Sequence, residues 1–142
     1  MIRKIEKKDI DRIMDIWLES TIKAHNFISK EYWENSYNTV KEVYIPMAET
    51  FVYEGEEGIR GFISIINNEF IGALFVDKNY QGSGIGKELI DYAIDKYKKL
   101  NLAVYKENKK SVDFYINRGF KIVKEQANED SGHSEYIMEK SF

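Results

Sequence analysis

Two helical patterns of apolar residues follow a short strand-like stretch at the start of the chain. Residues 1–5 read as a brief strand. From Ile10 to Leu18 apolar side chains recur every three or four positions, and Thr21 continues the same face, which predicts a helix. Asp9 or Asp11 lies near the start of this helix, where acidic side chains are favoured.

A second helix is predicted over residues 29–44. Ser29 is a suitable N-cap, because its hydroxyl can accept a hydrogen bond from the first turn. The helix should stop at or before Pro46, since proline disfavours helical backbone at the residue that precedes it. Its expected apolar stripe consists of Trp33, Tyr37, Val40 and Tyr44.

Residues 50–76 contain three β-rich apolar runs. The runs are separated by "EGEEG" and "NNE". Turn chemistry at both joints predicts a meander of three strands. The third run, Phe70–Val76, is almost wholly apolar, which predicts a central strand covered on both faces.

A glycine-rich stretch, "NYQGSGIGKELI" at residues 79–90, leads from this strand into another helical pattern. The helical spacing includes Ile85, Leu89, Ala93, Lys96, Tyr97 and Leu100. A strand is predicted at 102–107, because "LAVYKE" is rich in strand-forming residues. This order is a βαβ crossover, so the strands before and after the helix should be parallel.

The last third of the chain predicts a short helix and two strands. The helix covers residues 108–119 and can be capped by Gly119. The strands are expected at 120–126 and 134–141. The whole pattern predicts an α/β fold built on a mixed sheet, with residues 1–142 forming one domain.

Composition narrows the function classes. The chain has 142 residues, no cysteine, and a net charge of -3 from 21 basic and 24 acidic residues. That balance gives no electrostatic case for nucleic acid or an anionic membrane as partner. The lack of cysteine excludes a thiolate nucleophile and a thiolate zinc site, so no metal is expected. The charged first residues and the absence of a long apolar run predict a cytoplasmic protein.

A glycine-rich turn between a strand and a helix is typical of an anion site, because the first N–H groups of the helix are unpaired. Two familiar nucleotide patterns fail here. A dinucleotide pattern beginning at Gly82 requires glycine where Lys87 stands, and a P-loop requires glycine at Gln81 and a hydroxyl at Glu88. A nucleotide-binding domain is therefore disfavoured, and an ordinary strand-to-helix turn remains an alternative.

The loop does fit the pattern [QR]-x-x-G-x-[GA], through Gln81, Gly84 and Gly86. A second pattern follows, N-x-x-[AS]-x-x-[FL]-Y-x-x-x-G-F, whose fixed positions are Asn108, Ser111, Phe114, Tyr115, Gly119 and Phe120. With the order of elements along nearly the whole chain, these motifs resemble the GNAT superfamily of N-acetyltransferases. The segments "KAHNFI", "ALFVD" and "VYKENKKSVDFY" are similar to small bacterial members of the YjaB-like type.

The resemblance implies a GNAT-like fold, with helices on both faces of the sheet, and acetyl-CoA as co-substrate. Its pyrophosphate would bind backbone N–H groups from Gly82 to Lys87, and its pantetheine arm would lie between parallel strands that splay apart at Leu74–Val76 and Leu102–Tyr105. The implied cofactor-binding residues are Leu74, Phe75, Val76, Gln81, Gly82, Ser83, Gly84, Ile85, Gly86, Lys87 and Asn108. One departure is Lys78, where many relatives have proline in V-x-P-x-Y.

The implied activity is direct transfer of an acetyl group to a primary amine in a ternary complex. Tyr115 is the candidate general acid, with a structural aromatic as the alternative. Asn108 is also a good N-cap. His25 is the candidate base, because histidine titrates near neutral pH, although a helix-end histidine can be structural.

Phe27 and Trp33 are candidate acceptor contacts, with core packing as the alternative. The sequence leaves the acceptor open between a small amine, an amino acid and a peptide or protein amine, and it leaves monomer and homodimer open. A catalytically silent acyl-CoA sensor is the alternative function, which the presence of Tyr115 disfavours.

Overall fold

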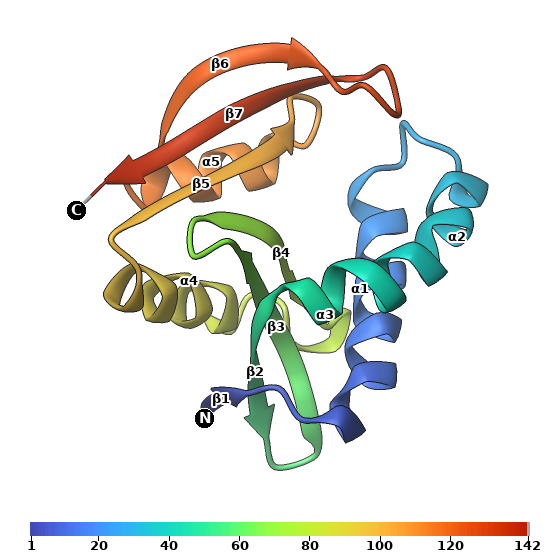
Figure 1. Cartoon of the computed structure of the whole chain (residues 1–142), viewed down its shortest axis with the longest axis vertical. Helices are drawn as coiled ribbons and strands as arrows, with labels where there is room; N and C mark the ends of the chain where they lie inside the picture. The colour runs from blue at the N-terminus through green and yellow to red at the C-terminus, as the bar shows by residue number, and fades with distance from the viewer. Residues whose placement is uncertain (142) are drawn as a thin grey trace.

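The structure is a computed structural model and describes residues 1–141. Seven strands form one sheet in the order β1-β2-β3-β4-β5-β7-β6 (Figure 1). The strands are β1 (Ile2–Lys4), β2 (Glu49–Gly55), β3 (Gly58–Ile66), β4 (Phe70–Val76), β5 (Lys99–Tyr105), β6 (Lys121–Ala127) and β7 (Ser134–Ser141). The helices are α1 (Ile10–Ala24), α2 (Lys30–Thr39), α3 (Ile45–Met47), α4 (Ile85–Lys96) and α5 (Lys109–Asn117). Two 3-10 turns, η1 (Lys7–Asp9) and η3 (Lys78–Tyr80), and a π-turn, η2 (Val40–Tyr44), complete them.

The sheet is mixed, and its single parallel pair divides it. Neighbouring strands are antiparallel except β4 and β5, whose parallel pairing holds one register pair, Phe70 with Asn101. Beyond that pair the two strands part, and Figure 1 shows β5, β7 and β6 set off from the β1–β4 half. The predicted α/β fold with a splayed parallel pair is confirmed.

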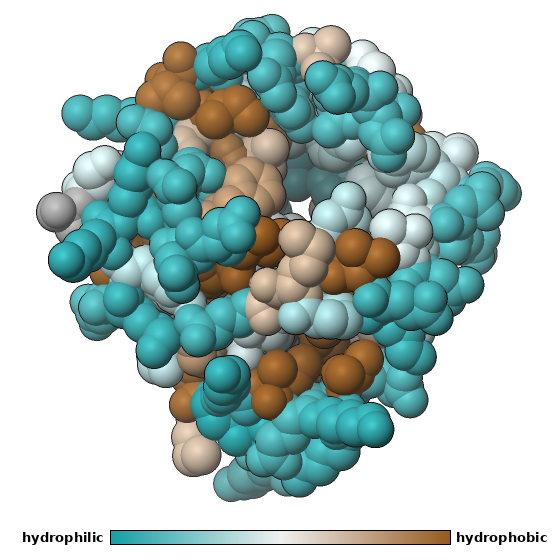
Figure 2. Space-filling model, in the orientation of Figure 1, coloured by the Kyte–Doolittle hydropathy of each residue, from teal (hydrophilic) through white to brown (hydrophobic). Residues whose placement is uncertain are grey.

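Two cores form because strand side chains alternate between the faces of the sheet. On one face Phe51 and Ile63 pack with α4 and α5. On the other face their neighbours Val52 and Phe62 pack with α1 and with Ile45 of α3. Figure 2 shows hydrophilic side chains around the rim of the molecule and hydrophobic ones nearer the middle of this view.

The second helical segment differs from its prediction. A π-turn widens it at η2, where the Ile45 N–H bonds the Val40 carbonyl. The extra residue in that turn shifts the apolar stripe by one position, so Ile45 is buried while Tyr44 is 48 % exposed. The helical backbone also continues one turn past the predicted stop, through Pro46 to Met47, where the Ala48 N–H bonds the Tyr44 and Ile45 carbonyls.

The end of α4 is the second correction. The expected helical spacing extended to Leu100, but α4 ends at Lys96 and β5 begins at Lys99. Leu100 fits both the helical period of α4 and the alternating period of a strand. Its alternation with buried Leu102 and Val104 places it in the strand. The expectation that β4 is covered on both faces is also only partly right. It is central in the sheet, but its last residues are half-buried where the strands part.

Replacing Asp9 by asparagine is expected to destabilise the fold. Asp9 is 5 % exposed, and its Oδ2 accepts hydrogen bonds from Arg3 Nη1 and from the Glu6 N–H, each at 2.8 Å. We expect a loss of about 2 kcal/mol in urea unfolding, because the change removes the buried charge that two Arg3 nitrogens bond and leaves Glu54 as the close ionic partner of Arg3. Asp11→Asn is the control, since the Asp11 ion pair with Lys41 is exposed, and no measurable change is expected there.

The same bonds give this contribution a pH dependence. The hydrogen bond from Arg3 lowers the pKa of Asp9 below its ordinary value. A lowered pKa means that the stabilisation is complete above the unfolded pKa of about 3.9 and is lost as the pH falls through the folded pKa. Asp9→Asn should therefore flatten the acid limb of the unfolding free energy, and an unchanged acid limb would contradict this assignment.

Candidate active site

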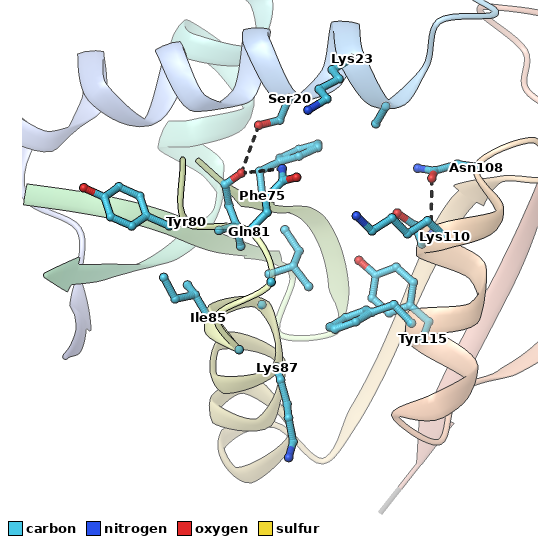
Figure 3. A pocket seen from close by; sticks show the side chains of 18 residues that line it. Ser20, Lys23, Phe75, Tyr80, Gln81, Ile85, Lys87, Asn108, Lys110 and Tyr115 are labelled. Atoms are coloured by element: carbon cyan, nitrogen blue, oxygen red, sulfur yellow. Dashed lines mark hydrogen bonds between the residues drawn. The ribbon is translucent and has the colours of Figure 1, made fainter. Parts of the chain in front are cut away.

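A cavity of about 590 Å³ lies between the end of β4 and the start of α5 (Figure 3). Its lining includes the expected Leu74–Val76 of β4 but not the expected Leu102–Tyr105 of β5. Its wall is built from the second half of α1, the end of β4, the glycine loop with the start of α4, and the start of α5. The lining residues are Ser20, Lys23, Ala24, Leu74, Phe75, Val76, Tyr80, Gln81, Gly82, Gly84, Ile85, Gly86, Lys87, Asn108, Lys110, Ser111, Phe114 and Tyr115. These segments are far apart in the sequence, so the fold rather than any one motif forms the cavity.

The glycine loop needs glycine for its backbone and leaves one side open. Gly82 and Gly84 have φ values of +84° and +87°, a left-handed conformation that other residues adopt at a cost. A Cβ added at either position would meet no atom within 4 Å. Gly84 is the N-cap of α4, whose first N–H groups have no helical partner. The loop therefore offers an anion close access to the backbone at a helix start.

The entry to this loop is fixed by Asp77 instead of by a proline. The Asp77 carboxylate accepts a hydrogen bond from the Asn79 N–H at 2.8 Å and thereby caps the turn η3. It also pairs with Arg12 of α1 at 2.5 Å. Burial alone would raise the pKa of Asp77, but the bonds from Arg12 and Asn79 outweigh it and lower the pKa. The carboxylate thus stays charged and holds the turn against α1.

The end of β4 presents its backbone to the cavity. The Asp77 N–H bonds the Arg60 carbonyl of β3, so alternation turns the backbone groups of Val76 and Leu74 toward the gap left by β5. The Val76 carbonyl accepts from Gln81 Nε2 at 3.2 Å and lies 3.5 Å from Ser20 Oγ, as drawn in Figure 3. Backbone groups that face a strand gap can bind the amides of an extended ligand, which at Val76 would compete with these two side chains.

Tyr115 lines the cavity from α5, opposite the glycine loop. Its ring packs edge to face against Phe114 and Phe120, which fixes its orientation. Figure 3 shows its hydroxyl on the side of the ring that faces the cavity. Burial raises the pKa of Tyr115 above its ordinary value, so the hydroxyl keeps its proton at physiological pH. Tyr115 is therefore a protonated hydroxyl that can serve as a donor, although the raised pKa makes it a weaker acid than a free tyrosine.

Asn108 connects the start of α5 to the end of α1. Its Oδ1 accepts the Ser111 N–H at 3.4 Å, so it is the N-cap predicted for this helix. Its Nδ2 lies 3.3 Å from His25 Nε2. Because the cap occupies the oxygen, the amide nitrogen is the group that faces His25, and it donates to the imidazole.

His25 has an environment that does not suit the expected base. It ends α1, lies outside the cavity lining, and is 9 % exposed. Burial lowers the pKa of His25 to about 4. Its Nε2 lone pair already accepts from Asn108, so Nδ1 carries the proton of the neutral ring. The structure thus gives His25 no free lone pair for an acceptor amine.

Phe27 and Trp33 lie in an aromatic cluster beside the cavity and not in its lining. The cluster consists of His25, Phe27, Trp33, Tyr105 and His133, whose ring centroids lie 5.1 to 6.5 Å from their neighbours. It joins the segment between α1 and α2 to the β6–β7 turn, where Tyr32 also donates to Asp130 at 3.0 Å. These ring contacts therefore favour a packing role for Phe27 and Trp33 over contact with the acceptor.

Sequence reasoning missed the contribution of α1 to the cavity. Ser20, Lys23 and Ala24 line it, and Lys110, Ser111 and Phe114 line it from α5. A signal for the first group existed, because Ser20, Lys23 and Ala24 share one helical face at spacings of three and four. Nothing local indicated which element that face would meet.

The features around the cavity together define a class of enzyme. A helix-start anion loop, a splayed parallel strand pair and a buried tyrosine around one cavity form the arrangement of a GNAT-type acetyltransferase. The sequence model of the family described as "Acetyltransferase (GNAT) domain" matches residues 16–142, and the chain belongs to this family. The protein is therefore an enzyme that transfers an acetyl group, and GNAT acetyltransferases use acetyl-CoA.

Individual proteins similar to this chain are also acetyltransferases. The chain is 36% identical over 123 residues to the peptidyl-lysine N-acetyltransferase YiaC of Escherichia coli, which covers 87% of this chain and 84% of the relative. It is 27% identical over 131 residues to the peptidyl-lysine N-acetyltransferase YjaB of the same organism, covering 92% and 88%. The solution structure of apo-form YjaB from Escherichia coli superimposes with a TM-score of 0.85 at 25% identity, covering 98% of this chain and 95% of that one.

Residues 1–141 contain neither a candidate metal site nor a candidate membrane-spanning helix. No group of three or more histidine and acidic side chains is placed to hold a metal ion there. Within the same residues, no helix has the length and apolar character to cross a membrane.

Proposed function

We propose that the enzyme acetylates the ε-amine of a lysine in a peptide or protein, using acetyl-CoA bound in the cavity between the end of β4 and the start of α5. The observation that carries the proposal is a single cavity with the glycine loop at one side and the Tyr115 hydroxyl at the other. The acceptor class is supported by the two relatives described above, which are named as peptidyl-lysine N-acetyltransferases.

The chemistry of the cavity wall suits acetyl-CoA. The N–H groups from Gly82 to Lys87 would hold the pyrophosphate, where a Cβ at Gly82 or Gly84 would project into open space. The backbone groups of Leu74 and Val76 would bind the pantetheine amides. The other residues proposed to contact the co-substrate are Phe75, Gln81, Ser83, Ile85 and Asn108.

Bound acetyl-CoA supplies a thioester whose carbonyl carbon is attacked by a neutral amine, with release of a thiolate. Tyr115 is the proposed general acid that protonates the sulfur as the carbon–sulfur bond breaks. Its raised pKa means that the hydroxyl carries its proton when the thiolate begins to leave. Asn108 caps α5 and so sets the direction in which Tyr115 projects.

The acceptor amine must lose its proton without help from the lining. The lining contains no carboxylate and no imidazole, so we propose that the proton leaves through water. A lysine amine has an ordinary pKa of about 10.4 and is mostly protonated at neutral pH. The rate should therefore rise about tenfold per pH unit between about pH 6 and 9, because each unit increases the neutral fraction tenfold.

An acceptor panel tests the proposal. We expect kcat/KM with acetyl-CoA to be at least about tenfold higher for a lysine peptide with a blocked N-terminus than for a matched peptide with arginine at that position and a free N-terminus, because only the first offers the proposed amine. A polyamine and free lysine complete the panel. Preference for any of these would contradict the lysine-peptide assignment. Coenzyme A binding by calorimetry without turnover of any amine would instead support the silent sensor.

A further inference from the structure

Helix α1 crosses the open end of the splayed sheet. The two halves of the sheet share one β4–β5 register pair, at Phe70 and Asn101, and the cavity lies at the opposite end of those strands. Backbone pairing there does not fix how far apart β4 and β5 stand. In Figure 3, α1 runs along the cavity between the glycine-loop side and the α5 side.

One ion pair joins α1 to the end of β4. Arg12, whose side chain is 41% exposed, pairs at 2.5 Å with Asp77, whose side chain is only 11% exposed. The same helix face carries Glu19, which pairs with Lys78 at 2.9 Å, but both of those side chains are more than half exposed. An exposed pair contributes little, whereas a partly buried charge depends on its partner. Arg12 thus forms the stronger of the two ion pairs between α1 and the loop entry, in addition to the Ser20–Val76 contact and the packing of α1 on the sheet.

A second attachment joins the other end of α1 to α5. Asn108 donates to His25 at 3.3 Å, across 83 residues of sequence. Tilted stacking on Trp33, with ring centroids 5.2 Å apart, holds the imidazole in place. The ring is nearly buried and its acceptor atom points at the cap of α5. His25 therefore connects the β1–β4 half, through α1, to the β5–β7 half.

We propose that α1 is a strut that sets the width of the acetyl-CoA slot, with Arg12 and His25 as the positioning residues at its two ends. Neither side chain lines the cavity. Each acts through a partner, Asp77 at the entry to the glycine loop and Asn108 at the start of α5. The inference rests on the proposed use of the cavity for acetyl-CoA. It adds a device that keeps both walls at the spacing that the co-substrate requires.

Two substitutions of His25 separate a strut from a base. Glutamine can still accept the Asn108 hydrogen bond but cannot titrate, while leucine can do neither. We expect His25→Gln to keep coenzyme A affinity and kcat within about threefold of wild type. We expect His25→Leu to weaken coenzyme A binding about tenfold, which corresponds to about one molecule in ten holding the slot at the width that binds coenzyme A. If both variants lost kcat equally and also lost the wild-type pH–rate profile, His25 would be a base and the strut role would be wrong.

The opposite end of α1 provides an independent test. Arg12→Met should also weaken coenzyme A binding about tenfold, whereas Arg12→Lys keeps a charge for Asp77 and should recover most of it. Glu19→Gln is the matched control, because it removes an exposed pair from the same helix, and it should leave affinity unchanged. Thermal unfolding of each variant verifies that it is folded, and Arg12→Met carries the test if His25→Leu is not.

The measurements distinguish this inference from the function on which it rests. Wild-type protein that fails to bind coenzyme A in calorimetry would overturn the proposed function itself. Wild-type binding together with unchanged affinity in folded Arg12→Met and His25→Leu would overturn only the strut. Reduced affinity in these two variants, with recovery in Arg12→Lys and His25→Gln, would support it.

Discussion

Gly84→Asp is expected to weaken coenzyme A binding by at least about a hundredfold while the domain stays folded, because juxtaposed like charges cost several kcal/mol. The new side chain would project from the N-cap of α4 into open space, where no atom lies within 4 Å of an added Cβ. That space is where the loop N–H groups would hold the pyrophosphate. Aspartate is a favourable N-cap and tolerates left-handed backbone better than most residues, so the helix itself should survive. Calorimetry with coenzyme A is the measurement.

Strain must be separated from charge in this experiment. Gly132→Asp is a matched control, because Gly132 has a φ of +78°, also has no atom within 4 Å of an added Cβ, and lies outside the cavity lining. It should carry a similar backbone strain and leave coenzyme A affinity unchanged. Gly84→Ala adds strain at the loop without charge and should fall between wild type and Gly84→Asp. Wild-type affinity in folded Gly84→Asp would remove the pyrophosphate from this loop.

Features set by local sequence were predicted well. The glycine loop, the Asn108 cap and Tyr115 all lie within short motifs, since each depends on neighbours only a few residues away. The parallel pair was also predictable, because a strand, a helix and a second strand in succession must cross over. The position of Tyr115 at the cavity needed only the short spacing from the cap that begins its helix.

Features set by distant contacts were not predictable. The Arg12–Asp77 and His25–Asn108 contacts join residues 65 and 83 positions apart, and no spacing along the chain reveals such pairs. His25 shows the consequence. Its residue type suggested a base with an ordinary pKa near 6.5, whereas burial lowers the pKa to about 4 and its lone pair faces Asn108. Residue type alone therefore did not indicate the lowered pKa or the hydrogen bond with Asn108, because both depend on the environment.

The π-turn and the end of α4 were missed for a different reason. Tyr44 and Ile45 are adjacent large apolar residues, so the periodicity could not decide which of them would be buried. Leu100 fits both a helix and a strand. In both places packing against the sheet selects one of two patterns that the sequence permits almost equally.

The largest expected effect on the chemical step comes from Tyr115→Phe. We expect kcat to fall about a hundredfold with little change in coenzyme A affinity, which is the low end for a lost general acid. The ring and its edge contacts with Phe114 and Phe120 remain, so the shape of the cavity is kept. What is lost is the proton for the departing thiolate. Steady-state kinetics with a lysine peptide, combined with calorimetry, measures the two quantities separately.

Tyr97→Phe is the matched control for this change. Tyr97 is as deeply buried as Tyr115, but it lies outside the active-site cavity and its hydroxyl bonds Glu49. Removing that hydroxyl should cost about 1 kcal/mol of unfolding free energy and leave kcat unchanged. Tyr115→Phe should leave the free energy of unfolding unchanged, because no group among residues 1–141 hydrogen-bonds the Tyr115 hydroxyl. Its kcat should fall. Equal kcat in Tyr115→Phe and wild type on a productive acceptor would make Tyr115 a structural aromatic, and the thiolate would then take its proton from water.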